Sequence, residues 1–375
     1  MSLVIAGLGP AARAQTSARL AAQFNAIFSP AVSARRQPGL AVLIRHDGRT
    51  LFKRAYGMRD LRCDLPNTPA TNFRLASCTK QFTAMAIMLL AHDGKLRYDE
   101  PLTEIFPRFP AYGRTITIRN LLDHTSGLQS YGAWMSKKYA GKDWEDIPQI
   151  TDARILALEE RQTGTLFPSG TRWQYSNGGF CLLAMIVAKV SGMPFPEFLR
   201  RRVFAPLGMR HSAAHVSGRD RVFQRAYGYT LDHGVWLETD QDPTSATLGD
   251  GGVYSSLDDL AKWDHALRRH TLLSAAAYRP AITPQAAIPA AAAAASDVPP
   301  VGSDGGRLAY GFGWFLDAYR GHRRMWHYGS TIGFNSLIAR YPGRKLTIIM
   351  LANRTDLSLP ALANRAADLV FSKSK

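Results

Sequence analysis

Apolar and polar positions along the chain predict strands near both ends. The run LAVLIRHDGRTLFKRAYG (40–57) contains two strand-like segments around an Asp-Gly turn, which is typical of a hairpin. Near the C-terminus, LIARY and LTIIML flank a Pro-Gly turn in the same way. Helices are expected around Ala14 to Phe28 and over the closing segment LPALANRAADLVF.

Helical patterns with turn-rich breaks fill the middle of the chain, from Ser77 to about Arg269. Ser77-Cys78-Thr79-Lys80 is followed by QFTAMAIMLLAHDGKL, an apolar run long enough for a buried helix that ends at Asp93-Gly94. Strands at both ends with helices between them predict an α+β fold, in which N- and C-terminal strands share one antiparallel sheet flanked by helices.

The same patterns suggest domain boundaries. Residues 14–76 and 307–375 are expected to form the sheet subdomain, and residues 77–306 an inserted, mainly helical subdomain. Within the insert, residues 275–306 are rich in Ala and Pro, which favours a surface loop, although poly-alanine is also compatible with a short helix.

Composition agrees with a globular enzyme. A chain of 375 residues that is 46% hydrophobic and 20% charged can bury a large core in one or two domains. No stretch is long and apolar enough to predict a membrane span. The start MSLVIAGLGPAARAQ has a short apolar core and an Ala-x-Ala-like end without the usual positive residues, so it does not establish a signal peptide.

The net charge of +17 raises the question of an acidic partner. Such a charge suits nucleic acid, anionic membrane surfaces or acidic cell-wall polymers. The basic clusters at 200–202, 268–270 and 322–324 are short, and none belongs to a recognisable nucleic-acid module. We therefore expect a solvated basic face and no nucleic-acid partner, and keep a catalytically silent basic binding protein as the alternative from another class.

Ser77 and Lys80 are the first candidate chemistry. Their spacing puts both side chains on one helix face, one turn apart, so the amine can help to take the proton of the hydroxyl. The same spacing recurs at Ser372 and Lys375 in a charged tail, so only the setting before an apolar helix distinguishes the first copy. A Ser77 that only caps the helix fits the same position.

Two further motifs accompany this pair. Tyr-x-Asn occurs once, at Tyr175 and Asn177, between a Pro/Ser/Gly turn and an apolar helix-like run. His-x-Gly occurs three times, but only the copy at His327 and Gly329 lies in strand-like sequence. Taken singly, Tyr175 and His327 are also compatible with core packing.

The remaining polar candidates predict structural roles. Cys63, Cys78 and Cys181 have no metal-ligand spacing and are expected to be free, with Cys78 turned away from the Ser77–Lys80 face. His124 lies between Asp123 and Ser126 and invites a triad interpretation, which is unnecessary where Ser-x-x-Lys is present. No metal ion is predicted.

Together with LLDHTSGL (121–128), PLGM (206–209), GDGGVYSSLDDLAKW (249–263) and YGFGW (310–314), these motifs resemble the serine β-lactamase and penicillin-binding-protein superfamily. The chain is most similar to the branch of class C β-lactamases, DD-carboxypeptidases, D-amino-acid peptidases and β-lactamase-fold carboxylesterases. The resemblance runs from about Pro38 to Leu369. It implies the α+β fold described above, no cofactor, a structural turn around His124, and a periplasmic or secreted location.

The resemblance also implies the site. Ser77 is the expected nucleophile. Lysine and tyrosine titrate near 10.4 and 10, so Lys80 and Tyr175 become useful bases only if each tunes the other, and we assign them jointly. Substrate-binding residues implied by the family are Asn177, His327, Gly329 and Ser330, with the backbone N–H groups of Ser77 and Ser330 as the oxyanion hole.

His327 is a departure, since class C β-lactamases commonly have a lysine there to hold the substrate carboxylate. A neutral histidine binds a carboxylate less strongly than a lysine does. The alternative roles for His327 are therefore to orient the substrate or to share in proton transfer. We predict a metal-independent serine hydrolase that forms an acyl-enzyme at Ser77 on a small-molecule, short peptide or ester substrate. A peptidase or amidase on D-amino-acid or peptidoglycan-like substrates ranks first, a carboxylesterase second and a β-lactamase third.

Overall fold

The computed structural model describes residues 10–32, 36–143, 146–219, 221–294 and 307–372. The first nine residues of the signal-like stretch, residues 295–306 of the Ala/Pro segment and Lys375 of the tail motif lie outside the described residues.

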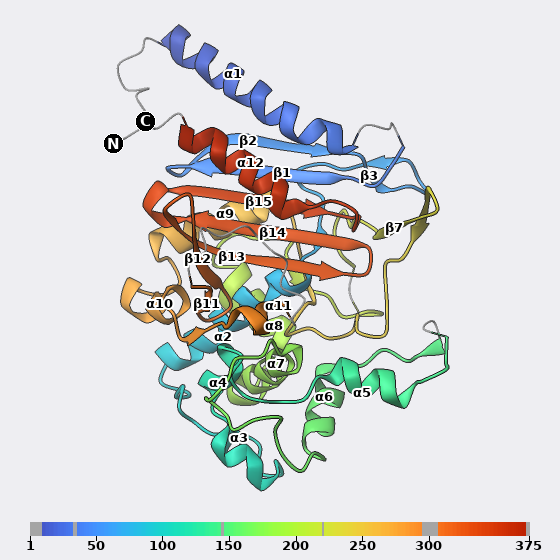
Figure 1. The fold of residues 1–375 in the computed structure, drawn as a ribbon, viewed down its shortest axis with the longest axis vertical. Helices are drawn as coiled ribbons and strands as arrows, with labels where there is room; N and C mark the ends of the chain where they lie inside the picture. The colour runs from blue at the N-terminus through green and yellow to red at the C-terminus, as the bar shows by residue number, and fades with distance from the viewer. Residues whose placement is uncertain (1–9, 33–35, 144–145, 220, 295–306, 373–375) are drawn as a thin grey trace.

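The central element is an antiparallel sheet of eight strands among the described residues (Figure 1). Its strands, in spatial order, are β10 (Ala286–Ala287), β11 (Ala309–Tyr310), β12 (Phe315–Tyr319), β13 (His322–Thr331), β14 (Phe334–Tyr341), β15 (Leu346–Ala352), β1 (Leu40–His46) and β2 (Arg49–Tyr56). β1 pairs with β15 from Leu40 opposite Ala352 to His46 opposite Leu346. The predicted sharing of one sheet by the two ends of the chain is confirmed.

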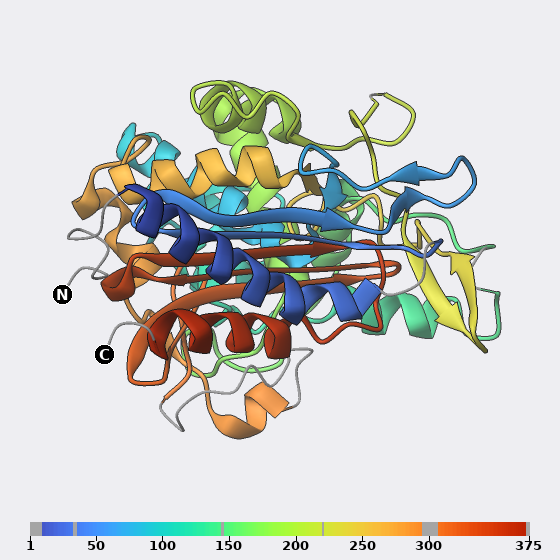
Figure 2. The same cartoon turned by 90° about the horizontal axis from the view of Figure 1, so that it is seen from above.

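Both faces of the sheet are buried at its central strands, which explains why β1 and β15 consist mainly of apolar residues. Leu40, Val42 and Ile44 of β1 face one core, and Ala41 and Leu43 face the other, because successive side chains of a strand alternate between faces. The first core lies against α1 (Pro10–Phe28) and α12 (Leu359–Phe371), and α9 (Leu257–Arg269) packs on the opposite face (Figure 2).

The helical region lies below the sheet in Figure 1 and is built around two buried helices, α2 and α7. Its helices are α2 (Lys80–His92), α3 (Leu102–Ile105), α4 (Ile118–Leu122), α5 (Tyr131–Lys138), α6 (Asp152–Glu159), α7 (Asn177–Ser191) and α8 (Phe195–Leu199). The described residues also form three small antiparallel sheets: β3 (Met58–Asp60) with β4 (Leu65–Pro66), β5 (Phe73–Arg74) with β9 (Val253–Ser255) and β6 (Ala213–Ala214), and β7 (Tyr229–Asp232) with β8 (Val235–Glu238). The predicted α+β class with a mainly helical insert is confirmed.

Two expectations need correction. Ser77 lies not in the α-helix but in the 3₁₀ segment η2 (Ala76–Thr79) that precedes it, and it caps neither segment, since the N-cap positions are Leu75 and Thr79. In the segment 275–306, where the sequence favours a loop and leaves a short helix open, the described residues form α10 (Ala275–Ile282), β10 and α11 (Ala290–Ala294). Alanine has the highest helix propensity, and Ser274 caps α10 by accepting the N–H of Ala277.

The proposed domain boundaries stay a prediction, and two observations bear on them. α9 packs against β1 and β15, and β10 extends the large sheet at its edge, although both belong to the segment assigned to the helical insert. Within the described residues no single helix is long and apolar enough to cross a membrane. α7 and the segment Phe195–Phe204 reach the length and apolar composition of a membrane span only when taken together, and the two are bent by 76° relative to each other.

Candidate active site

Ser77 and Lys80 are in direct contact. Ala76 adopts a φ of +46°, which turns the chain sharply into η2 and leaves Ser77 partly exposed. Lys80 Nζ donates a hydrogen bond to Ser77 Oγ at 3.0 Å. The neighbouring Cys78 points elsewhere: its Sγ donates to the carbonyl of His327 at 3.1 Å, and burial raises the pKa of the thiol to about 12. Cys78 therefore packs as a neutral thiol, as expected.

Lys80 is completely buried, yet its ammonium group has an acceptor for each of its N–H bonds. Besides Ser77 Oγ, it donates to Asn177 Oδ1 at 2.7 Å and to the carbonyl of Asp250 at 3.0 Å. Its Nζ lies 4.8 Å from the centre of the Tyr175 ring. Burial lowers the pKa of Lys80 to about 8, against the opposing charge of Asp250. The amine therefore titrates close to neutral pH.

The turn before α7 presents Tyr175 and Asn177 to the lysine. Ser176 is the N-cap of α7 and accepts the N–H of Gly179 at 3.1 Å, so its side chain is structural. The ring of Tyr175 stacks on Phe315 of β12 with ring centres 6.3 Å apart. The start of α7 and strand β12 thus fix the Asn177 amide and the Tyr175 ring beside Lys80.

His124 holds this turn from behind. It lies in the left-handed region with a φ of +63°, and its Nδ1 accepts the N–H of Ser176 at 3.1 Å. Its ring packs 4.4 Å from that of Tyr175, centre to centre. Burial lowers the pKa of His124 well below its usual value, so the ring is neutral. The structure supports a positioning role for His124 and does not support a role as a triad base. The sequence motif alone did not reveal the positioning role.

His327 is buried beneath the site rather than exposed in it. Its Nδ1 donates to the carbonyl of Tyr328 at 2.8 Å, which leaves Nε2 to accept the hydroxyl of Tyr310 at 2.9 Å. Burial and the nearby Lys80 charge lower the pKa of His327 to about 3. A neutral ring with both nitrogens engaged is poorly suited to gripping a carboxylate. The geometry favours orientation of neighbouring groups, His327 lying 6.4 Å from the Tyr175 ring, centre to centre.

Gly329 lets β13 approach the nucleophile closely. A Cβ at this position would lie 2.2 Å from the carbonyl oxygen of Leu75 and 3.0 Å from the backbone nitrogen of Ser77. Ser336, opposite Gly329 on β14, donates its hydroxyl to the same Leu75 carbonyl at 2.6 Å. The backbone of exposed Ser330 follows directly. Only glycine permits this contact between strand and η2.

Replacing Gly329 by alanine is therefore expected to push β13 away from Ser77. We expect the rate constant for Ser77 labelling by a fluorophosphonate to fall by about 10²-fold, because a displacement near 1 Å at a reacting centre has that effect. Gly343, in the turn between β14 and β15, has open space around its would-be Cβ and serves as the matched control. An unchanged labelling rate in Gly329→Ala would show that the close approach is dispensable.

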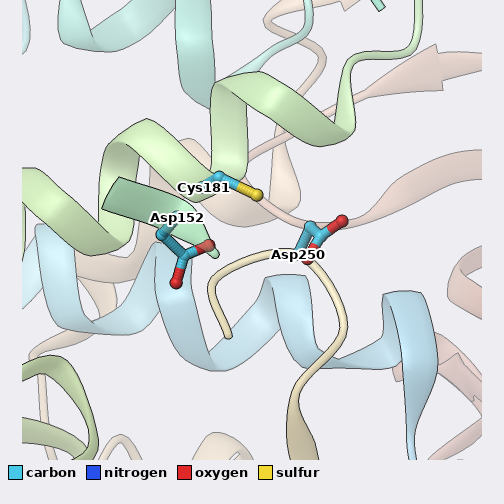
Figure 3. A group of neighbouring side chains, drawn as sticks. All are labelled: Asp152, Cys181 and Asp250. Atoms are coloured by element: carbon cyan, nitrogen blue, oxygen red, sulfur yellow. The ribbon is translucent and has the colours of Figure 1, made fainter. Parts of the chain in front are cut away.

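Two carboxyls and a thiol form a buried group (Figure 3), and one of its members, Asp250, binds Lys80 through its backbone carbonyl. The group consists of Asp152 at the start of α6, Cys181 on α7 and Asp250 in the loop before β9, with ligand-type atoms within 4.8 Å of one another. Burial and the charge of Asp250 raise the pKa of Asp152 to about 7. Sequence reasoning assigned no chemistry to this cluster. Asp250 belongs to the GDGG motif, whereas Asp152 and Cys181 carry no local signal.

Comparison with known proteins adds the family. The sequence model described as Beta-lactamase matches residues 24–371. The chain is 31% identical over 329 residues to penicillin-binding protein 4* of Bacillus subtilis (strain 168), covering 84% of this chain and 68% of that protein. It is 29% identical over 391 residues to esterase EstB of Burkholderia gladioli, covering 94% and 95%.

Solved structures agree with this assignment of the fold. D-amino acid amidase from Ochrobactrum anthropi SV3, complexed with L-phenylalanine amide, superposes with a TM-score of 0.75 at 26% identity. The match covers 95% of this chain and 100% of the amidase chain.

Proposed function

This chain belongs to the beta-lactamase family and is a serine hydrolase, and we propose that it acts on amides of D-amino-acid type through an acyl-enzyme at Ser77. The observation that carries the proposal is the contact of Ser77 Oγ with a buried Lys80 that is also bound by Asn177. Similarity to a D-amino acid amidase over the whole of that protein supports the choice of substrate.

In this mechanism Ser77 Oγ attacks the carbonyl carbon of the substrate while its proton passes to the Lys80–Tyr175 pair. With a lysine pKa of about 8, about one molecule in ten holds a neutral amine at pH 7. Lys80 and Tyr175 then return the proton to the leaving amine. In the second half-reaction water attacks the acyl carbonyl while the same pair accepts its proton; the bond from Ser77 Oγ to the acyl carbon then breaks, and the pair returns that proton to Ser77 Oγ.

The negative charge of the tetrahedral intermediate needs donors that are already in place. We assign this role to the backbone N–H groups of Ser77 and Ser330. The close approach of β13 to η2 at Gly329 supports the assignment, because it brings the strand edge beside the Ser77 nitrogen. Asn177, which accepts from Lys80, is placed to orient the substrate through its amide nitrogen.

A carboxylesterase is the second candidate. The match to esterase EstB spans nearly the full length of both chains, whereas penicillin-binding protein 4* is matched over 68% of its length. The alcohol that leaves an ester needs less help from a proton donor than the amine that leaves an amide. The same residues are therefore sufficient to hydrolyse esters.

The silent binding protein is disfavoured. Its basic clusters would have to be available to a polyanion, but the triplet at 200–202 is engaged by acidic side chains of the chain itself. Arg200 and Arg201 both bind Glu197, and Arg202 binds Asp93 at 2.8 Å.

A matched set of substrates tests the proposal. We expect turnover of a D-alanine p-nitroanilide, slower turnover of its L-enantiomer, and a mass increase of one phosphonyl group on intact protein after incubation with a fluorophosphonate, which loses fluoride when the serine oxygen attacks its phosphorus. Turnover of p-nitrophenyl esters alone would favour the esterase, and turnover of a chromogenic cephalosporin alone the β-lactamase. Absence of any covalent adduct would contradict the acyl-enzyme.

A further inference from the structure

We propose that Asp250 is the internal counter-charge of Lys80, a positioning residue that sets the pH range in which the Ser77 hydroxyl is activated. The inference rests on the proposed role of Lys80 as part of the base. It assigns chemistry to the Asp152–Cys181–Asp250 cluster of Figure 3, which the mechanism above does not use.

Asp250 is fixed to the lysine and away from solvent. Its backbone carbonyl accepts a hydrogen bond from Lys80 Nζ at 3.0 Å, and its Oδ2 accepts the hydroxyl of Tyr131 at 2.9 Å. Its Oδ1 has no hydrogen-bond partner among the described residues, and the residue is only 5% exposed. A carboxylate buried with one oxygen unpartnered is costly unless a cation lies close by. Lys80, whose Nζ is held by the backbone carbonyl of Asp250, supplies positive charge beside it, and the Asp250 charge acts on the lysine in turn.

The other titratable groups around Lys80 are neutral at working pH, so they do not compete for this role. Burial lowers the pKa values of both nearby histidines and raises those of the nearby thiols and of the tyrosine on α5; these groups are His124, His327, Cys78, Cys181 and Tyr131. Among the described side chains around the lysine, Asp250 is therefore the remaining source of negative charge.

Asp152 behaves differently from Asp250 within the cluster. It accepts backbone N–H groups from Leu248 at 3.1 Å and Gly249 at 3.4 Å, and it keeps a proton up to about pH 7 because it is buried beside the charge of Asp250. Asp250 opposes the effect of burial on Lys80 more than any other group does. The positive charge of Lys80 and the negative charge of Asp250 thus offset each other inside the protein, and Asp152 is the protonated neighbour of Asp250.

The proposal predicts the sign of a pH shift. Removing the Asp250 charge favours loss of a proton from the Lys80–Tyr175 pair, whichever of the two holds it. The rate of Ser77 modification falls toward low pH as the base becomes protonated, and this part of the pH profile is its acid limb. In Asp250→Asn the acid limb should therefore move to lower pH by about one unit. The asparagine carboxamide oxygen can still accept the Tyr131 hydroxyl, so packing is retained.

The experiment measures the rate of Ser77 labelling by a fluorophosphonate as a function of pH in the parent, Asp250→Asn and Asp152→Asn. Asp152→Asn is the matched control, because it removes a buried carboxyl of the same cluster while its amide oxygen can still accept from the loop. We expect a larger shift to lower pH in Asp250→Asn than in Asp152→Asn. Equal shifts, no shift, or a shift to higher pH in Asp250→Asn would overturn the inference.

Two further variants keep the outcome interpretable. Tyr131→Phe removes the hydrogen bond that holds Asp250 Oδ2 in place, so it should move the acid limb in the same direction if Asp250→Asn does not fold. An unmoved limb in Tyr131→Phe would then count against the inference. Labelling of Ser77→Ala would contradict the proposed function itself, whereas an unlabelled Ser77→Ala with an unmoved limb in the Asp250 variant would contradict the counter-charge alone.

Discussion

Ser77→Ala is expected to lower the turnover number by about 10⁶-fold, the loss typical of removing a serine nucleophile. Ser77 Oγ is the hydroxyl that contacts Lys80 Nζ, so its removal leaves the base without a group to activate. The same variant should show no mass increase with a fluorophosphonate. Intact-mass spectrometry and steady-state assays on the parent and the variant measure both effects.

Cys78→Ala is the matched control for this loss. Cys78 is adjacent to Ser77 in η2, but its thiol faces the His327 carbonyl and is completely buried. Labelling should therefore persist in Cys78→Ala with the same stoichiometry as in the parent. If Ser77→Ala were still labelled and Cys78→Ala were not, the nucleophile would be the thiol.

Much of the fold was predictable because both ends of the chain carry strong local signals. β1 and β2 enclose the Asp47-Gly48 turn, in which both residues have positive φ, as a tight hairpin requires. Apolar runs buried on both faces identify β14 and β15 as central strands. The pairing of β1 with β15 is not local, and its prediction depended on the family resemblance as well as on the pattern.

The assembly of Ser77, Lys80, Tyr175 and Asn177 followed from the order of motifs, whose roles stay proposals. The 3₁₀ geometry at Ser77 did not, because the left-handed turn at Ala76 is imposed by tertiary contacts rather than by residue preference. Asp250 illustrates the same limit. Its carbonyl and carboxyl meet Lys80 and Tyr131 across long stretches of sequence, and no spacing rule links them.

His327 shows how a motif can be located correctly while its chemistry stays open. Strand context distinguished it from the two His-x-Gly turns, and it does lie on β13 beside the site. Its neutral, doubly hydrogen-bonded state depends on Tyr310, which comes from β11 and is buried with it. The choice between gripping a carboxylate and orienting neighbours is therefore made by burial, which one sequence does not reveal.

Lys80→Met is expected to lower the turnover number by about 10³- to 10⁴-fold, the upper range for loss of a general base. Methionine nearly preserves side-chain volume and removes the amine. It also leaves Asp250 buried without its cation, so the melting temperature should fall. In Lys80→Met with Asp250→Asn the melting temperature should recover while activity stays low. Recovery of activity in that double variant would show that the lysine only maintains structure.

Tyr175→Phe tests whether the lysine and the tyrosine act as one unit. The centre of the Tyr175 ring lies 4.8 Å from Lys80 Nζ. Because we assign the two residues to one proton transfer, loss of the tyrosine hydroxyl should impair that transfer. We expect Tyr175→Phe alone to lower turnover by about 10²-fold or more. Combined with Lys80→Met it should add little, because residues that share one step are strongly non-additive. If the two losses multiplied in full, measured at the same pH, the groups would act in separate steps and the joint assignment would be wrong.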